Sequence, residues 1–237
     1  MQQVAKIDTH LHSKLSNCSS LTLRFLIQQG QREPAAVLLC TDHGTNEAYS
    51  RLSEALPNHL VIPAIEVETE EGDFLVFSDN VEYINSLKDF DGSITDLKSD
   101  DHTAIIWAHP CVNQRESVEP LTFAKNGPYR DEDEERIAKI VHKVDAVELF
   151  NGTILSLAAL GLVNQTYFDN LKLIAKRHHL AVTGGSDAHE EETWGKAWTE
   201  FPGPITSIAD FILALKERRT RPDYDHDFFS LPEQTQI

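Results

Sequence analysis

The feature that most constrains the fold is an alternation of short apolar runs with longer helical patterns. The runs are rich in Val and Ile, and helical periodicity separates most of them. This alternation is typical of βα units built around a parallel sheet. Strands are expected at residues 4–7, 36–40, 60–67, 74–77, 103–108, 146–150, 180–183 and 197–201. Helices are expected at residues 21–29, 46–56, 131–144, 167–179 and 205–218.

This element order predicts an α/β barrel in one domain spanning residues 1–237, although a doubly wound sheet has the same local pattern. A length of 237 residues suits one α/β barrel. Gly72-Asp73 lies between two apolar runs and predicts a hairpin without a helix. Residues 112–127 show no period and are expected to form a long loop, and the polar tail after Pro222 is expected to wrap the surface.

Five of the eleven histidines follow the predicted strands, at the sheet edge where barrel enzymes place their active sites. These histidines are His10, His12, His43, His109 and His189. In an extended chain, residues two apart point to the same side, so His10 and His12 project together. Asp187 and His189 share this spacing, and Glu66 ends a strand. A single histidine at a strand end is more often a solvated or hydrogen-bonded residue. Several converging with carboxylates favour a site for Zn²⁺, Mn²⁺ or Fe²⁺.

The motifs around these residues resemble the PHP (polymerase and histidinol phosphatase) superfamily over residues 6–201. They are, in order, Asp8-Thr9-His10-Leu11-His12-Ser13, Thr41-Asp42-His43, Glu66, Ala108-His109-Pro110 and Ser186-Asp187-Ala188-His189. The resemblance implies a distorted (β/α)7 barrel whose mouth binds two or three divalent metal ions and hydrolyses phosphoesters. Residues 202–237 would then form a closing helix and tail.

The resemblance also implies a set of metal ligands: His10, His12, His43, Glu66, Asp73, His109, Asp187 and His189. Glu66 would bridge the first ion, bound by the His-x-His pair and Asp187, to a second ion shared with His109. Asp73 occupies a place where the family often has histidine. A third ion would rest on His43 and His189, but the acid usual after the first motif is replaced by Asn17. A neutral amide is a poorer ligand, so the third site is expected to be weak or empty.

The expected reaction is attack by a metal-activated hydroxide on a phosphomonoester, without a covalent enzyme intermediate. His189 or His43 would act as general acid if the third ion is absent. The basic residues Arg115, Lys14 and Lys196 are candidate phosphate contacts. Asn151 ends a predicted strand and would either contact substrate or cap the next helix.

A net charge of −17 argues against long nucleic acids as partners but not against a small phosphorylated metabolite, which is the expected substrate. A nuclease or nucleotide phosphodiesterase, and a regulatory metal-binding module without catalysis, are the alternatives. An amidohydrolase-type enzyme also uses His-x-His, but it normally adds a mid-barrel Lys or a further His, and no Lys ends a predicted strand here. Three cysteines and the lack of an apolar segment of signal or membrane length predict a cytoplasmic protein without a membrane partner.

Overall fold

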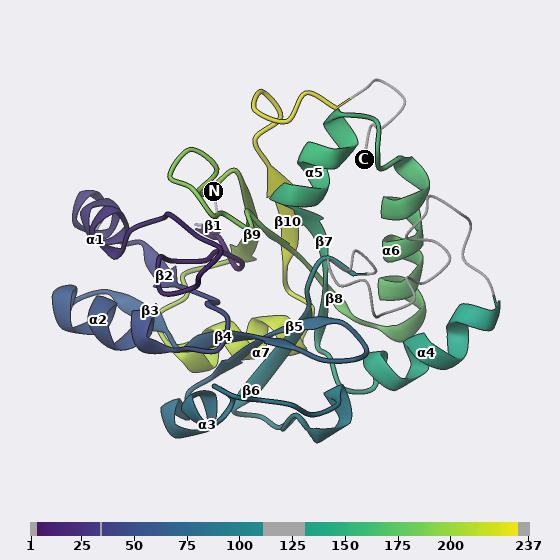
Figure 1. Ribbon diagram of the computed structural model, residues 1–237, viewed down its shortest axis with the longest axis horizontal. Helices are drawn as coiled ribbons and strands as arrows, with labels where there is room; N and C mark the ends of the chain where they lie inside the picture. Colours follow the sequence, from purple (N-terminus) through teal and green to yellow (C-terminus); the bar gives the residue numbers. More distant parts are fainter. Residues whose placement is uncertain (1–3, 34, 111–130, 232–237) are drawn as a thin grey trace.

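The computed structural model describes residues 4–33, 35–110 and 131–231 of the chain (Figure 1). Its strands are β1 (Val4–Ile7), β2 (Val37–Leu39), β3 (Leu60–Ile62), β4 (Ala64–Glu68), β5 (Asp73–Ser78), β6 (Thr103–Trp107), β7 (Ala146–Asn151), β8 (Ala181–Gly185), β9 (Ala197–Pro202) and β10 (Arg221–Tyr224). Its helices are α1 (Leu23–Arg32), α2 (Glu47–Ala55), α3 (Val81–Ser86), the 3₁₀ turn η1 (Ile94–Asp96), α4 (Asp131–Val141), α5 (Gly152–Ala159), α6 (Gln165–His178) and α7 (Ile208–Lys216).

The strands form three sheets, so the fold is mixed α/β. The largest has the order β4-β5-β6-β7-β8, with antiparallel pairing from β4 to β6 and parallel pairing from β6 to β8. β1-β9-β10 is antiparallel, and β2 pairs with β3 in parallel. The described strands therefore do not close into one continuous barrel. An isolated bridge from Leu11 to Ala188 joins the segments that follow β1 and β8, and another joins His43, which follows β2, to Glu66 in β4. Each of these bridges connects two different sheets.

Several sequence predictions need correction. Residues 60–67 form two strands rather than one, because Pro63 lacks the N–H that a continuous ladder requires. β3 pairs with β2, whereas β4 turns through the predicted hairpin onto β5. The tail contributes β10, which extends the sheet of β9, and helices α3 and α5 were not predicted. The predicted loop at 112–127 lies outside the described residues.

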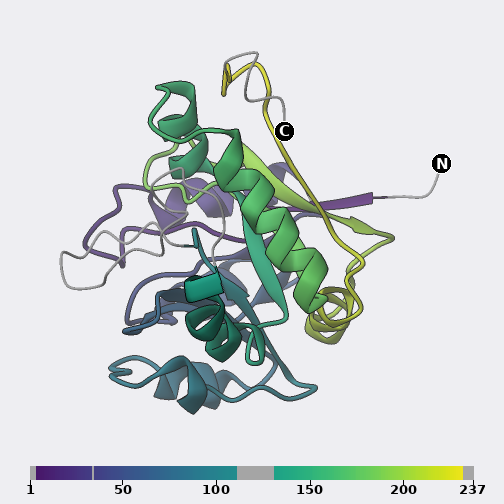
Figure 2. The same ribbon diagram turned by 90° about the vertical axis from the view of Figure 1, so that its right-hand side faces the viewer.

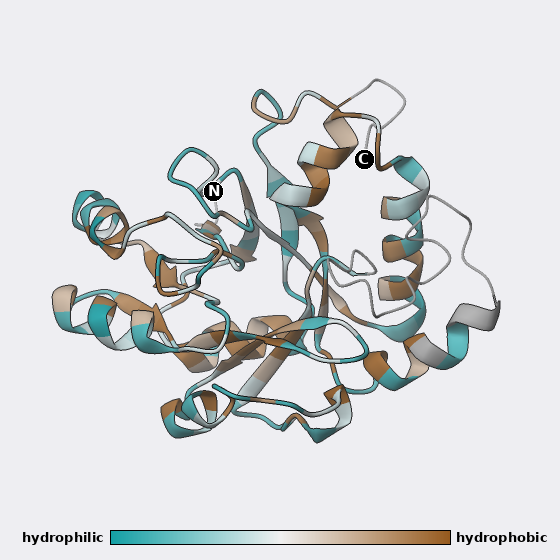
Figure 3. Ribbon diagram, viewed as in Figure 1, coloured by the Kyte–Doolittle hydropathy of each residue, from teal (hydrophilic) through white to brown (hydrophobic). Residues whose placement is uncertain are grey.

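The large sheet separates two apolar layers. Leu75 and Ile106 point inward and pack with Phe211 of α7, which lies across one end of the sheet. Their neighbours Phe74 and Ile105 point outward into the layer that also buries α4, α5 and α6. Figure 2 shows α6 running along the outside of this sheet, and the apolar and polar sides of the helices are visible in Figure 3.

The inner layer is apolar near α7 and polar at the opposite strand ends. Ala64 and Ala146 lie in the apolar layer. Two residues further along the same strands stand Glu66 and Glu148, both buried. Because alternate residues of a strand share a face, both carboxylates point to the inner side. The polar centre therefore lies next to the apolar layer, two residues further along the same strands.

Within the described residues, no helix is long and apolar enough to cross a membrane. Cys18 is exposed and Cys40 is buried, and both are free thiols. Cys111 lies outside the described residues.

Candidate metal centre

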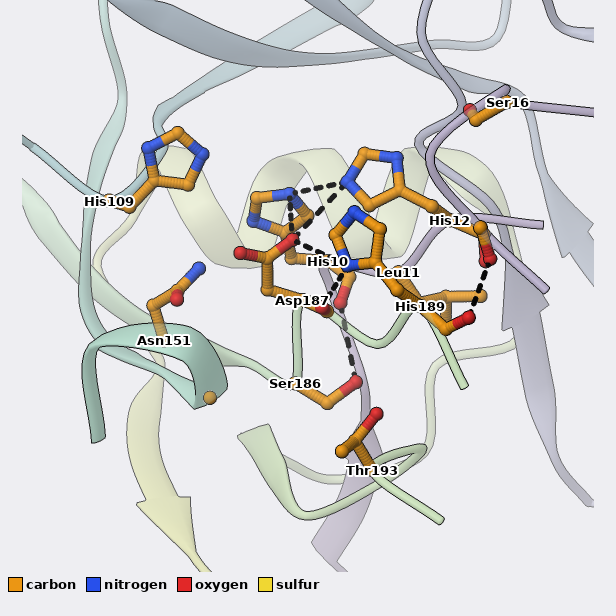
Figure 4. Close-up of polar contacts among 12 residues, drawn as sticks. His10, Leu11, His12, Ser16, His109, Asn151, Ser186, Asp187, His189 and Thr193 are labelled. Atoms are coloured by element: carbon orange, nitrogen blue, oxygen red, sulfur yellow. Dashed lines mark hydrogen bonds and ion pairs between the residues drawn. The ribbon is translucent and has the colours of Figure 1, made fainter. Parts of the chain in front are cut away.

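One backbone bridge sets the register of the two ligand motifs. Leu11 bridges Ala188, with the amide of His12 donating to the carbonyl of Ala188 at 3.0 Å and that of Asp187 to the carbonyl of His10 at 2.7 Å. The residues on either side of the bridge therefore meet in pairs. Figure 4 shows His10, His12 and His189 gathered around Asp187, with His109 at one side.

The chain is strained where it presents two of these side chains. Asp187 and His109 have positive φ angles of 49° and 24°. Such backbone conformations cost about 1–3 kcal/mol in non-glycine residues and cluster at functional sites. Asp8 holds the turn before Asp187 by accepting hydrogen bonds from the amides of Ser186 at 2.8 Å and Gly195 at 3.0 Å.

Gly185 allows the close approach of β8 to the His10 backbone. A Cβ at this position would lie 2.4 Å from the Cβ of His10 and 2.9 Å from a carboxylate oxygen of Glu148. Any larger residue would push the His-x-His segment away from Asp187. The glycine is therefore a steric requirement of the centre.

Four buried side chains direct one donor atom each toward a common point. His10 Nε2 lies 3.2 Å from His12 Nε2, and the two nitrogens lie 3.4 and 3.1 Å from Glu66 Oε2. Asp187 Oδ1 lies 3.4 Å from His10 Nε2 and 3.3 Å from His12 Nε2. A tetrahedral metal ion with bonds of about 2.0–2.2 Å sets its ligand atoms roughly 3.3–3.6 Å apart. The donor set fits a divalent cation in both chemistry and spacing.

The second oxygen of Glu66 faces a different group of donors. Glu66 Oε1 lies 3.2 Å from His109 Nε2, yet this buried oxygen makes no hydrogen bond among the described residues. Asp73 Oδ2 lies 3.9 Å from His109 Nδ1, and Glu66, Asp73 and His109 present donor atoms within 4.8 Å of one another. Glu66 is thus placed to bridge two cations.

Proton affinities in the centre follow from burial among opposite charges. Burial opposes a charge on His12, but hydrogen bonds to Asp187 and Glu66 outweigh it and raise the pKa of His12 to about 9. Burial also opposes a charge on His109, but the adjacent Glu66 carboxylate outweighs it and raises the pKa of His109 to about 9. Burial raises the pKa of Asp73 to about 6, although His109 counteracts it. With pKa values of about 9, His12 and His109 favour protonation at neutral pH when no cation is bound, so cation binding there would release protons.

His43 and His189 form the outer edge of the centre. The side chains of both are about one-third exposed, and the ring of each lies 4.6 Å from that of His12. His43 Nε2 is 3.5 Å from Glu66 Oε2. Burial lowers the pKa of His43 to about 4. His189 Nδ1 donates to the carbonyl of Asp187 at 2.8 Å. Both imidazoles thus lie beside the His12 ring on the solvent-exposed side of the centre.

Comparison with known proteins gives one partial family match. A family model described as PHP-associated matches residues 172–220, a segment that includes Asp187 and His189. No curated protein matches the chain significantly in sequence.

Solved structures match over most of the chain. PsfC from Pseudomonas syringae is 18% identical, with a TM-score of 0.62 over 94% of this chain and 92% of its own. A two-domain protein from Bacteroides vulgatus, containing a predicted PHP-like metal-dependent phosphoesterase, is 15% identical, with a TM-score of 0.61 over 94% of this chain and 65% of its own. The match to the PHP-associated family model, together with the shared fold, supports the resemblance to the PHP superfamily.

An endonuclease has a similar fold. The lesion-specific endonuclease Q from Pyrococcus furiosus is 15% identical, with a TM-score of 0.54 over 91% of this chain and 56% of its own. The chain thus spans less than two thirds of the length of both the endonuclease and the two-domain protein. At such identities the likeness concerns the fold and leaves the substrate of this chain open.

Sequence reasoning missed one buried residue of the candidate centre, Glu148 on β7. Its carboxylate accepts from His10 Nδ1 at 3.0 Å, from the amide of His109 at 2.8 Å and from Asn151 Nδ2 at 3.0 Å. By holding a proton on His10 Nδ1, Glu148 leaves the Nε2 lone pair free for a cation. The available signal was a charged residue inside an otherwise apolar strand, on the same face as Ala146.

The predicted substrate contacts have mixed outcomes. Asn151 is buried, and its Oδ1 accepts from the amide of Ile154, so it caps α5. Lys196 Nζ lies 2.7 Å from Asp225 Oδ2, which occupies it in an ion pair. Lys14 is exposed on the loop after His12, and Arg115 lies outside the described residues.

Proposed function

We propose that this PHP protein is a metal-dependent phosphoesterase that hydrolyses a small phosphorylated substrate, with a phosphomonoester preferred. The observation that carries the proposal is the bridging arrangement of Glu66, with one oxygen toward His10 and His12 and the other toward His109. Two adjacent cation positions sharing a carboxylate suit phosphoryl transfer, because both the attacking and the leaving oxygen need charge stabilisation. Divalent cations bound there would supply Lewis acidity and lower the pKa of a bound water.

Charge balance supports an anionic substrate. Glu66, Asp73, Glu148 and Asp187 place four carboxylates around the centre. Two divalent cations balance these charges, and a third makes the mouth positive. Of the two predicted phosphate contacts that the structure describes, Lys14 is exposed and Lys196 forms an ion pair with Asp225. We therefore infer that cations at the centre provide most of the attraction for phosphate.

The chain's own residues would then orient the reaction. Glu148 fixes the tautomer of His10, and Glu66 holds its two oxygens toward separate donor groups. His189 and His43 reach the mouth, where an imidazole can transfer a proton to the departing alcohol. We infer that the three sheets, joined by single bridges at the ligand residues, form the distorted barrel of the superfamily.

A phosphodiesterase or nuclease is the second candidate. The similar fold of endonuclease Q, which acts on lesions, favours it. The net charge of −17 opposes a long nucleic acid, which would have to approach an acidic surface. A nucleotide or short oligonucleotide is compatible with both observations.

The test is hydrolysis by protein stripped with EDTA and then reloaded with Mn²⁺, Zn²⁺ or Fe²⁺. Faster turnover of p-nitrophenyl phosphate than of its bis-ester supports the monoesterase, and the opposite order supports the second candidate. Asp187→Asn is expected to lower turnover at least about 100-fold, because it removes a carboxylate from the centre. Asp79→Asn, which changes an exposed Asp–His pair, is the matched control. Full activity in metal-free protein, or metal-loaded protein inactive on both esters, would contradict the proposal.

A further inference from the structure

A cavity lies on the outer side of the large sheet, away from the candidate metal centre. It has a volume of about 610 Å³, and most of its lining comes from α6, β7, β8 and β10, which lie near one another in Figure 1. Leu149 and Phe150 of β7 line it and belong to the outer apolar layer, whereas the neighbouring Glu148 points to the metal centre. Small-molecule sites commonly have volumes of about 300–1,000 Å³. The cavity is thus large enough for a ligand of its own, and the sheet separates it from the metal centre.

The lining of this cavity is largely apolar and includes aromatic rings. Phe150 and Tyr224 are buried, and their rings meet edge to face with centroids 4.9 Å apart. Leu180 and the half-buried Val182 add aliphatic surface. The ring of His226 lies 4.1 Å from that of Tyr224. Such a lining favours a ligand with an apolar or aromatic body.

The charged side chains at the cavity are mostly basic, although the net charge of the chain is −17. Lys172 and Lys176 stand one turn apart on α6, and both are exposed. Neither lysine forms an ion pair with another of the described residues. Like charges at this spacing repel each other along a helix. An anionic group bound between the two ammonium groups would relieve this repulsion.

The remaining charged side chains of the lining already have partners. Arg221 donates from Nε to Glu200 Oε2 at 3.0 Å. Asp223 Oδ1 lies 3.4 Å from His226 Nε2. The two lysines are therefore the charges of the lining that a ligand can engage.

We propose that this cavity binds a small organic anion, with its apolar body against Phe150 and Val182 and its acidic group between Lys172 and Lys176. The site is separate from the metal centre and does not rest on the proposed function. Hydrogen bonds between an ammonium group and an anionic oxygen are stronger than those between neutral groups. The lysines therefore select an acid over a neutral molecule with the same apolar body.

Fluorescence titration of metal-free protein with anilinonaphthalene sulfonate tests the site, because this dye combines an aromatic body with one acidic group. The parent is expected to bind the dye saturably, and octanoate should displace it at least about tenfold more effectively than uncharged octanol. Lys172→Gln combined with Lys176→Gln should weaken dye binding about tenfold. Lys88→Gln combined with Lys98→Gln removes the same charge from exposed positions elsewhere. This matched control should leave the affinity unchanged.

A second variant tests the apolar part of the cavity without changing its charge. Val182→Trp fills the space from β8 and should abolish saturable dye binding, while a cooperative urea transition shows that the variant is folded. If this variant does not fold, the lysine double variant decides the question by itself.

Four results would overturn the proposal: a parent without saturable binding, a lysine double variant with the affinity of the parent, octanol as effective as octanoate, or binding that appears only after Mn²⁺ is added. The last result would mean that the dye binds at the metal centre. Hydrolysis of phosphate esters is not a readout here, so a failure of the proposed function would leave the result on this cavity intact.

Discussion

Replacing Glu148 by Gln is expected to weaken cation binding by about 10–100-fold while preserving the fold. The carboxylate serves three donors: His10 Nδ1, the amide of His109 and Asn151 Nδ2. Gln has one acceptor oxygen, and if that oxygen keeps the last two donors, its NH₂ group faces His10. His10 must then accept at Nδ1 and carry its proton on Nε2, the atom that lies 3.4 Å from Asp187 Oδ1. The ligand atom is thereby blocked.

The energetic scale supports this magnitude. A tenfold to hundredfold loss corresponds to about 1.4–2.7 kcal/mol, close to the roughly 1.5–3 kcal/mol of a hydrogen bond to a charged group. Competition with a chromophoric chelator measures the affinity, and urea unfolding of the metal-free protein measures stability. Glu200→Gln is the matched control, because Glu200 is also largely buried and pairs with Arg221 on a different sheet. A folded Glu148→Gln protein whose affinity stays within twofold of the parent would refute the tautomer argument.

Three further outcomes follow from the contacts of the centre. Gly185→Ala should destabilise the protein by about 1–3 kcal/mol in urea unfolding, because its Cβ would lie 2.4 Å from the Cβ of His10; unchanged stability would contradict the close approach. Asp42→Asn should cost about 1–3 kcal/mol, since Asp42 accepts from the amide of Ser13 at 2.6 Å and from the Ser16 hydroxyl at 2.9 Å. An equal loss in Asp79→Asn would show that this effect is unspecific. Chelation should lower the melting temperature in calorimetry by about 5–11 °C relative to protein at a hundredfold excess of metal over its Kd. An identical melting temperature with and without metal would count against a bound cation in the native state.

The candidate ligands were largely visible in the sequence because all except Asp73, which only the family resemblance indicated, end or follow a predicted strand. The His-x-His and Asp-x-His spacings encode a shared direction, which the single bridge between Leu11 and Ala188 then realises. Glu148 was missed because one acid within a strand has no spacing partner. Its role depends on three donors from distant segments, which no local pattern contains.

The sheet arrangement was less predictable than the strands themselves. Local patterns identify a strand, but pairing depends on long-range partners, and the break at Pro63 separates two neighbouring strands into different sheets. β10 was missed because Arg221–Tyr224 carries polar residues on an edge strand and lacks an apolar run. Its pairing with β9 is a property of the folded chain.

The bridge at Leu11 and Ala188 has a consequence for how the molecule opens. Where a longer ladder would hold two segments together, the backbone contributes a single bridging pair, and the side chains beside it are the proposed ligands. A cation bound there would cross-link the segments that follow β1 and β8, which main-chain pairing alone holds weakly. Loss of the ion should therefore allow these two segments to open locally before the rest of the molecule unfolds. Occupancy of the proposed cation site and the local stability of these segments should thus change together.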